Sequence, residues 1–236
     1  MTADNPLRPD IARELIARAL ESAAHRAMRV RDQIDAVQLG RGRHTDHANS
    51  RVLRRILAEH DWPGHRLVGI DGSRAAWSIA LHSNDDPPFQ RAAATLLGRA
   101  VQAGEAPIQH WAHLHDRALI TNGCDQEYGT QLLLDADGIG LCPLRAPESV
   151  DARRATVGLP PIAVALTAVR RRYSADHSEH LLFPPQAEAS TACKTLAHTS
   201  RTTGVMPWFT GRTRVGTEGG HRGAASAQER RLVVAL

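Results

Sequence analysis

A histidine at the end of an apolar segment is the first candidate for chemistry in this chain. His82 follows the segment Ala75–Leu81, and the next four residues, Ser83-Asn84-Asp85-Asp86, end in two carboxylates. A histidine beside carboxylates is suited to general acid–base catalysis, because a carboxylate can fix the tautomer of the imidazole. The same position is also explained by the interaction of an imidazole with a helix dipole, so both interpretations stay open.

An adjacent pair of opposite charges, Asp116 and Arg117, is the second candidate. Neighbouring side chains diverge on a helix, so the two residues need not pair with each other. Arg117 is suited to bind an anionic group, and Asp116 is suited to orient a base or a donor. An ordinary charged helix face is the alternative, and the pair alone does not exclude it.

The stretch Gln126-Glu127-Tyr128-Gly129-Thr130-Gln131 is the third candidate. In a strand, Gln126, Tyr128 and Thr130 would share one face. Gly129 within a strand indicates a bulge or the close approach of another group. A polar strand face against buried helices is costly unless its groups are satisfied, which indicates a polar pocket.

The residues His110, His113 and His115 next to Asp116 are of the types that bind transition metals. On a helix His110 and His113 share a face, but His115 lies about 200° away from His113. The i, i+4 spacing of a helical zinc site is absent. We therefore expect packed or solvated histidines and predict no metal site.

Read together, four sets of residues resemble the bacterial family catalogued as domain of unknown function 6624. The resemblance covers about residues 11–170 and supplies no reaction. It implies that polar residues from an apolar helix, a helix start and a hairpin strand converge on one cleft. The residues that carry it are Trp62-Pro63, His82 with Asp85 and Gln90, Asp116-Arg117, and Gln126 with Tyr128, Gly129 and Gln131.

The elements expected to position these residues are mostly helices. Apolar periodicity and proline or glycine breaks predict a mainly α, single-domain fold over residues 1–173. A β-hairpin is expected near 127–144, with the strand 128–134 and a turn at 135–138. The tail 174–236 is rich in Gly, Ser and Thr and is expected to have little order. Helices are predicted at about 9–37, 50–60, 73–82, 88–103, 107–121, 149–157 and 161–173, with a polar loop at 41–49 and an extended segment at 67–70.

Composition narrows the class of protein further. The 236 residues contain no run of eighteen apolar residues, no leader-like start and only three cysteines, which predicts a cytoplasmic protein without a membrane span. Residues 1–173 hold 22 Arg against 20 acidic residues, and residues 174–236 hold 7 basic against 5 acidic, so each part carries +2. This even spread argues against nucleic-acid binding. Phosphate-binding and dinucleotide-binding glycine motifs are absent, so no cofactor is predicted.

Two functions fit these residues. The first is a cofactor-independent hydrolase or group-transfer enzyme acting on a small polar or anionic substrate. In that interpretation His82 is the acid or base, Asp85 or Asp116 orients it, and Arg117 holds an anionic group. The residues that position the substrate would be Gln90, Gln126, Tyr128 and Gln131. The second is a non-catalytic binding or protein-interaction module, in which the same residues form a buried hydrogen-bond network.

Overall fold

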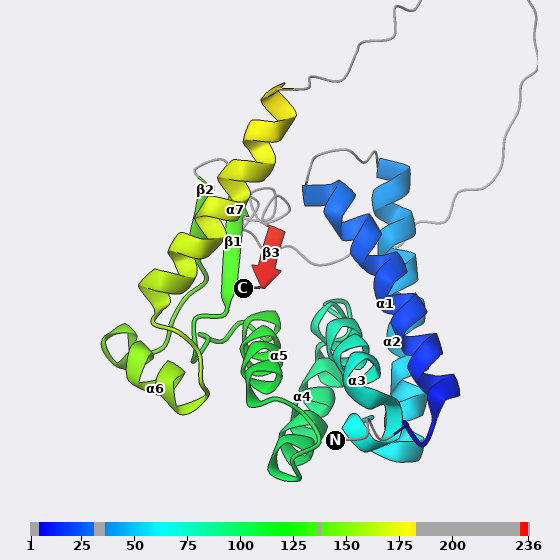
Figure 1. Cartoon of the computed structure of the whole chain (residues 1–236). Coiled ribbons are helices and arrows are strands. Elements are labelled where there is room, and N and C mark those ends of the chain that lie inside the picture. The colour runs from blue at the N-terminus through cyan, green and yellow to red at the C-terminus, as the bar shows by residue number, and fades with distance from the viewer. Residues whose placement is uncertain (1–4, 31–35, 136–137, 183–231, 236) are drawn as a thin grey trace, which may run out of the picture.

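The computed structural model describes residues 5–30, 36–135, 138–182 and 232–235 of the chain. Helices make up most of these residues, and a small antiparallel sheet lies beside them (Figure 1), so the predicted fold class is confirmed. The described elements, in chain order, are α1 (Pro9–Val30), α2 (Ala36–His60), α3 (His65–Leu81), α4 (Pro87–Gln102), α5 (Ile108–Thr121), β1 (Gln131–Asp135), β2 (Gly138–Leu141), the short 3-10 helix η1 (Pro147–Ser149), α6 (Val150–Thr156), α7 (Ile162–Leu182) and β3 (Leu232–Ala235).

The hydrophobic core lies where α1 to α5 meet. α1 and α3 lie side by side and run in the same direction, because the backbone N–H groups of Leu7 and Arg8 donate to carbonyls at the start of α3. Burial of a leucine side chain stabilises a fold by roughly 1.5–3 kcal/mol, so this core is a main source of stability. Its fully buried members include Leu15, Leu53, Ala76, Ala80, Leu97 and Leu114.

The polar segment 41–49 is helical, so the predicted loop there is wrong. α2 continues through Gly40 and Gly42 to His60. Its polar side chains bond across to α1 instead of ending the helix: the Asn49 amide donates to the Ser22 hydroxyl at 2.8 Å. The polar groups on this face of α2 are thus satisfied by hydrogen bonds to polar groups of α1.

Residues 67–70, which are predicted to be extended, lie instead in α3, and the helix is interrupted at Gly69. The N–H groups of Leu67 and Val68 both donate to the Gly64 carbonyl, which closes the turn. Gly69 then takes φ 74° and ψ 174°, a conformation that favours glycine, and the helix resumes after it. The helix predicted at 73–82 therefore begins earlier, at His65.

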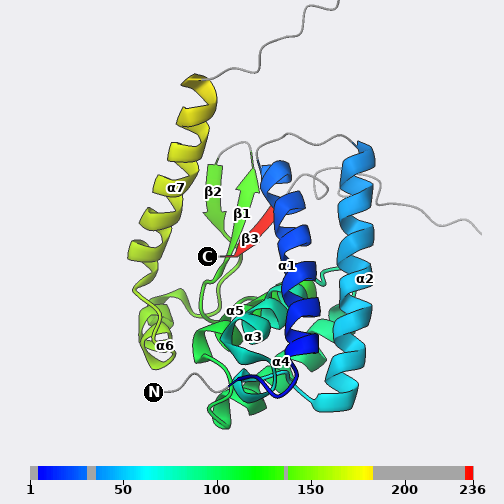
Figure 2. The ribbon, with the colours of Figure 1, turned by 45° about the vertical axis from the view of Figure 1, so that its right-hand side comes forward.

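The sheet contains the predicted hairpin and a third strand. β1 pairs with β2 through Leu132 opposite Leu141, and with β3 through Leu132 opposite Val234. Figure 2 shows the sheet between α7 on one side and α1 on the other. β1 begins at Gln131 and not at residue 128, because the preceding residues bond to α5.

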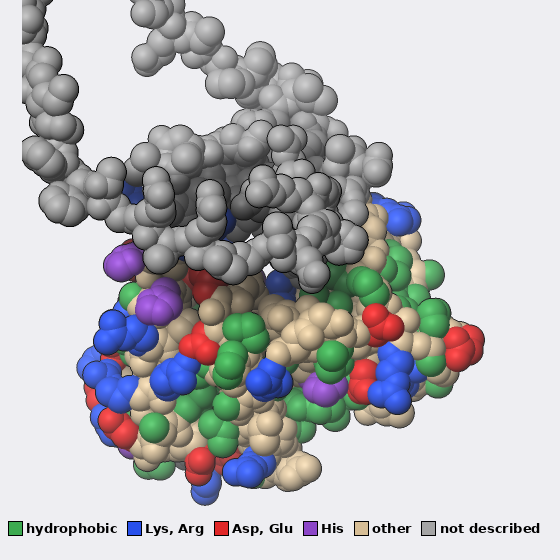
Figure 3. Space-filling model, turned by 180° about the vertical axis from the view of Figure 1, so that it is seen from behind, with side chains coloured by type: hydrophobic (Ala, Val, Ile, Leu, Met, Phe, Trp, Pro, Cys, Tyr) green, Lys and Arg blue, Asp and Glu red, His purple; other side chains and the backbone are tan. Residues whose placement is uncertain are grey.

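Most of the predicted low-order tail, 174–236, lies outside the described residues. Its described parts are the last turns of α7, which reaches Leu182, and the strand β3. Within the described ranges, no helix is both long and apolar enough to cross a bilayer. On the face shown in Figure 3, arginine and acidic side chains are interspersed among apolar and neutral ones.

Candidate functional site

The carboxylate of Asp116 is the anchor of the loop that leads into β1. It accepts hydrogen bonds from the backbone N–H groups of Glu127 at 2.8 Å, Tyr128 at 3.1 Å and Thr130 at 3.0 Å, and from the Thr130 hydroxyl at 2.9 Å. Burial raises the pKa of Asp116, and these four donors oppose that shift. Asp116 therefore positions the loop 126–131. No bond from its carboxylate to His82 is found within the described part of the chain.

Two of the predicted substrate-binding glutamines hold this loop to the hairpin. The Gln126 amide donates to the carbonyls of Gln131 at 3.0 Å and Cys142 at 2.9 Å, and its oxygen accepts from the Gln131 N–H at 2.8 Å. The Gln131 amide donates to the His113 carbonyl and to the Thr130 hydroxyl. Both side chains are fully buried, and their bonds supplement the backbone bridge between Gln126 and Leu144.

The other two residues predicted to bind the substrate, Gln90 and Tyr128, also contact other groups of the protein. The Gln90 amide donates to the carbonyls of Ala80 and Leu81, each at 3.1 Å, and its oxygen accepts from the Thr121 hydroxyl at 2.8 Å. Gln90 thus joins α4 to the end of α3 and to α5. The Tyr128 ring packs edge-on against Trp111, with ring centroids 5.9 Å apart.

Arg154 is a buried residue of this network that the sequence interpretation missed. It is only 1% exposed, and its guanidinium donates to the carbonyls of Tyr128 and Pro160, each at 2.6 Å. Gly129 follows Tyr128 in the loop and has φ 64°. The Ile162 side chain occupies the space where a Cβ atom of residue 129 would lie. The predicted close approach at Gly129 is therefore present, but the residue lies in a loop and not in a strand.

A second group of polar residues gathers at the C-terminal end of α3, and we call it the His82 cluster. The guanidinium of Arg26 lies 3.6 Å from the Asp46 carboxylate and donates to the Ser78 hydroxyl at 3.4 Å. The hydroxyl of Ser22 bonds to Asp46 as well. The members of the His82 cluster are Arg26, Asp46, Ser78, His82, Asp85 and Arg117.

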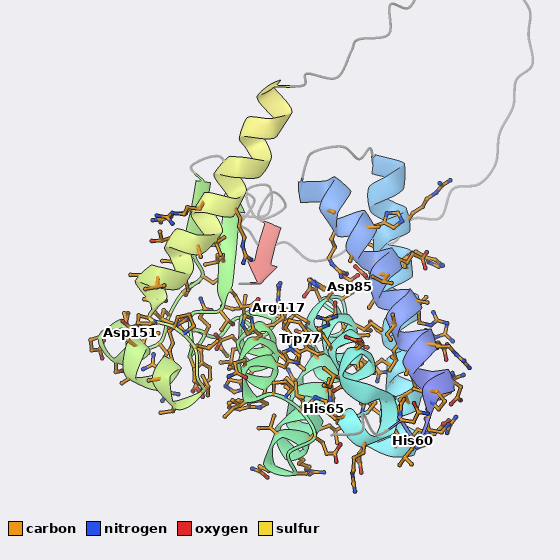
Figure 4. All side chains as sticks on the ribbon, viewed as in Figure 1. His60, His65, Trp77, Asp85, Arg117 and Asp151 are labelled. Carbon is orange, nitrogen blue, oxygen red and sulfur yellow. The ribbon has the colours of Figure 1, made fainter. Side chains whose placement is uncertain are left out.

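His82 is close to two positive charges. Burial lowers the pKa of His82 well below its usual value, and the charges of Arg26 and Arg117 lower it further. The His82 ring is therefore neutral at neutral pH. Figure 4 shows Asp85 and Arg117 at the same end of the helical body, the end that faces the sheet. Arg117 is thus near enough to His82 for its charge to act on the imidazole.

The cluster also contains the two carboxylates of Asp46 and Asp85. Burial raises the pKa of Asp46, with opposing contributions from the Ser22 hydrogen bond and the Arg26 charge and a further increase from Asp85. Asp85 is exposed and follows the end of α3. No bond between Asp85 and His82 is found in the described residues, so its influence on the cluster is through charge.

Arg117 remains charged although it is 1% exposed. Desolvation lowers its pKa to about 10, partly opposed by Cys142. At neutral pH the cluster therefore contains two guanidinium groups, a neutral imidazole and the carboxylates of Asp46 and Asp85. Neighbouring groups whose pKa values move in opposite directions are typical of acid–base sites.

The three clustered histidines on α5 pack against aromatic rings. His110 stacks on Trp77, with ring centroids 4.3 Å apart, and His113 meets the same indole edge-on at 6.0 Å. His115 stacks on Trp111 and lies 3.4 Å from Glu127. In the part of the chain that the structure describes, no group of three or more His, Cys, Asp or Glu side chains is placed to hold a metal ion.

Arg26 and Asp46 are the site residues that sequence reasoning missed. The signal lies in α1, where the apolar spacing Ile11, Leu15 and Ala19 continues into Ser22 and Arg26. Polar residues that continue a buried helix face need polar partners, and α2 supplies them.

The chain matches the model of a family of unknown function, DUF6624, over residues 9–175. The chain belongs to this family. The matched range contains every residue of the His82 cluster and of the Asp116 network. No curated protein and no solved structure matches the chain.

Proposed function

We propose that this protein is a cofactor-independent hydrolase or group-transfer enzyme that acts on a small polar or anionic substrate, with His82 as its general base. The observation that carries the proposal is the neutral imidazole beside the guanidinium groups of Arg26 and Arg117. Guanidinium groups bind carboxylate and phosphate groups, and a neutral imidazole can accept a proton. A cytoplasmic location is part of the proposal and fits the free thiols of Cys124 and Cys142.

The two arginines would also control the basicity of His82. In the free protein burial lowers the pKa of His82 and the charges of the two arginines lower it further, so the ring is a weak base. A bound anion would neutralise part of their charge and raise the pKa of His82 toward the operating pH. His82 would therefore accept a proton from water or from a substrate hydroxyl when the site is occupied, and it would return that proton to the leaving group.

The carboxylates have separate roles in this proposal. Asp46 lies 3.6 Å from Arg26 and holds that guanidinium in place. Asp85 is exposed and adds a negative charge to the cluster, where it raises the pKa of Asp46. Asp116 is a positioning residue, because its bonds fix the loop that carries Thr130 and Gln131.

A non-catalytic binding or interaction module is the second candidate function. The network around Asp116, Gln126 and Arg154 favours it, since the hydrogen bonds of these buried side chains in the described residues go to backbone atoms and to the Thr130 hydroxyl. Such networks specify a fold without any chemistry. The two candidates differ at His82, which is a site residue in the first and a structural residue in the second.

An assay with chromogenic esters separates the candidates. We expect the full-length protein to hydrolyse 4-nitrophenyl acetate or 4-nitrophenyl phosphate, and the His82→Gln variant to lose at least about a hundredfold in rate, the size of a typical general-base contribution. His115→Gln is the matched control, because His115 is also a partly exposed histidine but lies outside the cluster. Equal rates in wild type and His82→Gln would contradict the proposed role.

A further inference from the structure

An apolar groove lies between α1 and α3, with a volume of about 390 Å³. This is within the range of small-molecule sites, roughly 300–1,000 Å³. Leu20 remains 66% exposed, so apolar surface is left open on this face. The residues that line the groove include Ile16, Ala19, Leu20 and Ala23 of α1 and Ala75 and Trp77 of α3.

The groove leads into the His82 cluster. The lining residue Ala23 is followed three positions later on α1 by Arg26, and the lining residue Ser78 is followed four positions later on α3 by His82. Residues three or four apart share a helix face. Ser78 also accepts the hydrogen bond from Arg26 at 3.4 Å, so it belongs to both the groove and the cluster.

The lining of the groove carries no net charge, and the Arg26 guanidinium lies beside the lining residue Ser78 at one end. Asp71 and Arg74 line the groove, but they form an ion pair at 3.0 Å and so offset each other. The Trp77 indole, which stacks on His110, forms a rigid apolar wall. Figure 4 shows Trp77 between the level of His65 and that of Arg117. A molecule in the groove would therefore meet apolar surface along its length and a guanidinium group at the end.

We propose that this groove binds the apolar part of the substrate, so that the substrate is an amphipathic organic anion: a carboxylate or phosphate with a linear or aromatic apolar group. The proposal rests on the proposed function, because it uses Arg26 as the anion-binding end. The apolar group lies against Leu20, Ala23 and Trp77, and the anionic group lies at Arg26 beside His82. A fatty acid, an aryl acid and an alkyl phosphate share this chemistry.

The test is the affinity of the full-length protein for acetate, butyrate, hexanoate and octanoate, measured by calorimetry. Each methylene group that enters the groove should tighten binding by about fourfold. Octyl phosphate and benzoate, measured in parallel, distinguish alkyl phosphates and aryl acids from fatty acids. Octylammonium is the charge control, and it should bind at least tenfold more weakly than octanoate.

Three variants identify the site. Ala23→Phe fills the groove from an exposed position of α1 and should remove the dependence of affinity on chain length. Ala17→Phe is the matched control, because Ala17 is exposed on the same helix and does not line the groove. Arg26→Gln should weaken all the carboxylates together, by tenfold or more.

The outcomes distinguish the two proposals. If acetate and octanoate bind with equal affinity and both depend on Arg26, the groove proposal is overturned and the proposed function stands. If no anion shows a dependence on Arg26, the anion site of the proposed function fails and the groove proposal fails with it. If Ala17→Phe and Ala23→Phe reduce octanoate binding equally, octanoate binds elsewhere on the surface and the groove proposal is overturned.

Discussion

Asp116 and Arg117 are consecutive residues of α5, yet their side chains serve two different parts of the molecule. The Asp116 carboxylate accepts four hydrogen bonds from the loop 127–130, whereas the charge of Arg117 acts on His82. The helix geometry that makes neighbouring side chains diverge thus connects a structural network to a candidate reactive site. We expect a substitution in the loop 127–130 to move Arg117 only slightly, because the loop bonds to Asp116 and is linked to Arg117 only through the α5 backbone.

Replacement of Asp116 by Asn should destabilise the fold strongly. The amide keeps the shape but presents an NH₂ group in place of one oxygen, so either the Glu127 N–H or the Thr130 N–H loses its acceptor. We expect a loss of about 2–4 kcal/mol in the free energy of unfolding, measured by urea denaturation. Asp125→Asn, an exposed carboxylate next to the loop, is the control and should change stability by less than about 0.5 kcal/mol. Equal stability of the two variants would contradict the anchoring role.

Variants of His82 and Gln126 should separate the site from the network. His82→Ala removes a partly exposed ring, and we expect a loss of less than about 1 kcal/mol. Gln126→Ala removes three buried hydrogen bonds, to the carbonyls of Gln131 and Cys142 and from the Gln131 N–H, and the expected loss is about 2–4 kcal/mol. Thermal and urea unfolding of both variants measure the difference. A His82 variant that unfolds as readily as the Gln126 variant would assign His82 to the structural network.

Gly129→Ala should be destabilising for two reasons that a matched variant separates. Gly129 has φ 64° and the Ile162 side chain fills the space beside it, whereas Gly123 has φ 73° and open space around it. Gly123→Ala therefore reports the backbone strain alone, about 1 kcal/mol. We expect Gly129→Ala to cost at least about 1 kcal/mol more, and the double variant with Ile162→Ala to recover part of that difference. Equal costs at the two glycines would show that Ile162 gives way.

Stability should fall in mild acid because of the buried histidines. Burial lowers the pKa of both His110 and His113 to about 4, below the value of about 6.5 expected in the unfolded chain. The unfolded state therefore binds protons first as pH falls, so the stability present above pH 6.5 is lost between about pH 6.5 and 4. For His113, which is 9% exposed, the loss reaches about 3 kcal/mol. Urea unfolding from pH 7.5 to 4.5 measures it, and His113→Phe should flatten the dependence. An unchanged slope in that variant would contradict the assignment.

The sequence predicts the helical class and the hairpin because both depend on local patterns. The apolar spacing of α1, α4 and α5 and the turn predicted at 135–138 can each be recognised from a few neighbouring residues of the sequence. The polar segment 41–49 is different, since its helix depends on Ser22 and Arg26 in another helix. Local composition alone cannot reveal partners that are more than twenty residues away.

The candidate site was predictable only in part for a related reason. Residue type and the family resemblance predict His82 and Arg117 as site residues. Residue type alone, however, does not distinguish a side chain that is hydrogen-bonded within the protein from one that is available to a ligand. Gln90, Gln126 and Gln131 have the composition of a binding site, and their side-chain bonds to other protein groups appear only in three dimensions. The sequence does not single out Asp46, because its segment 41–49 has the polar composition of a loop.

The most direct test of the central claim is the pKa of the His82 ring, measured by NMR titration with and without inorganic phosphate. His82→Gln identifies the resonance, and Arg26→Gln is the companion variant. We expect a pKa below 6.5 in the free protein and an increase when phosphate binds, with a smaller increase in Arg26→Gln. A His82 pKa that phosphate leaves unchanged at saturating concentration would contradict the assignment of His82 and its arginines as an anion-dependent base.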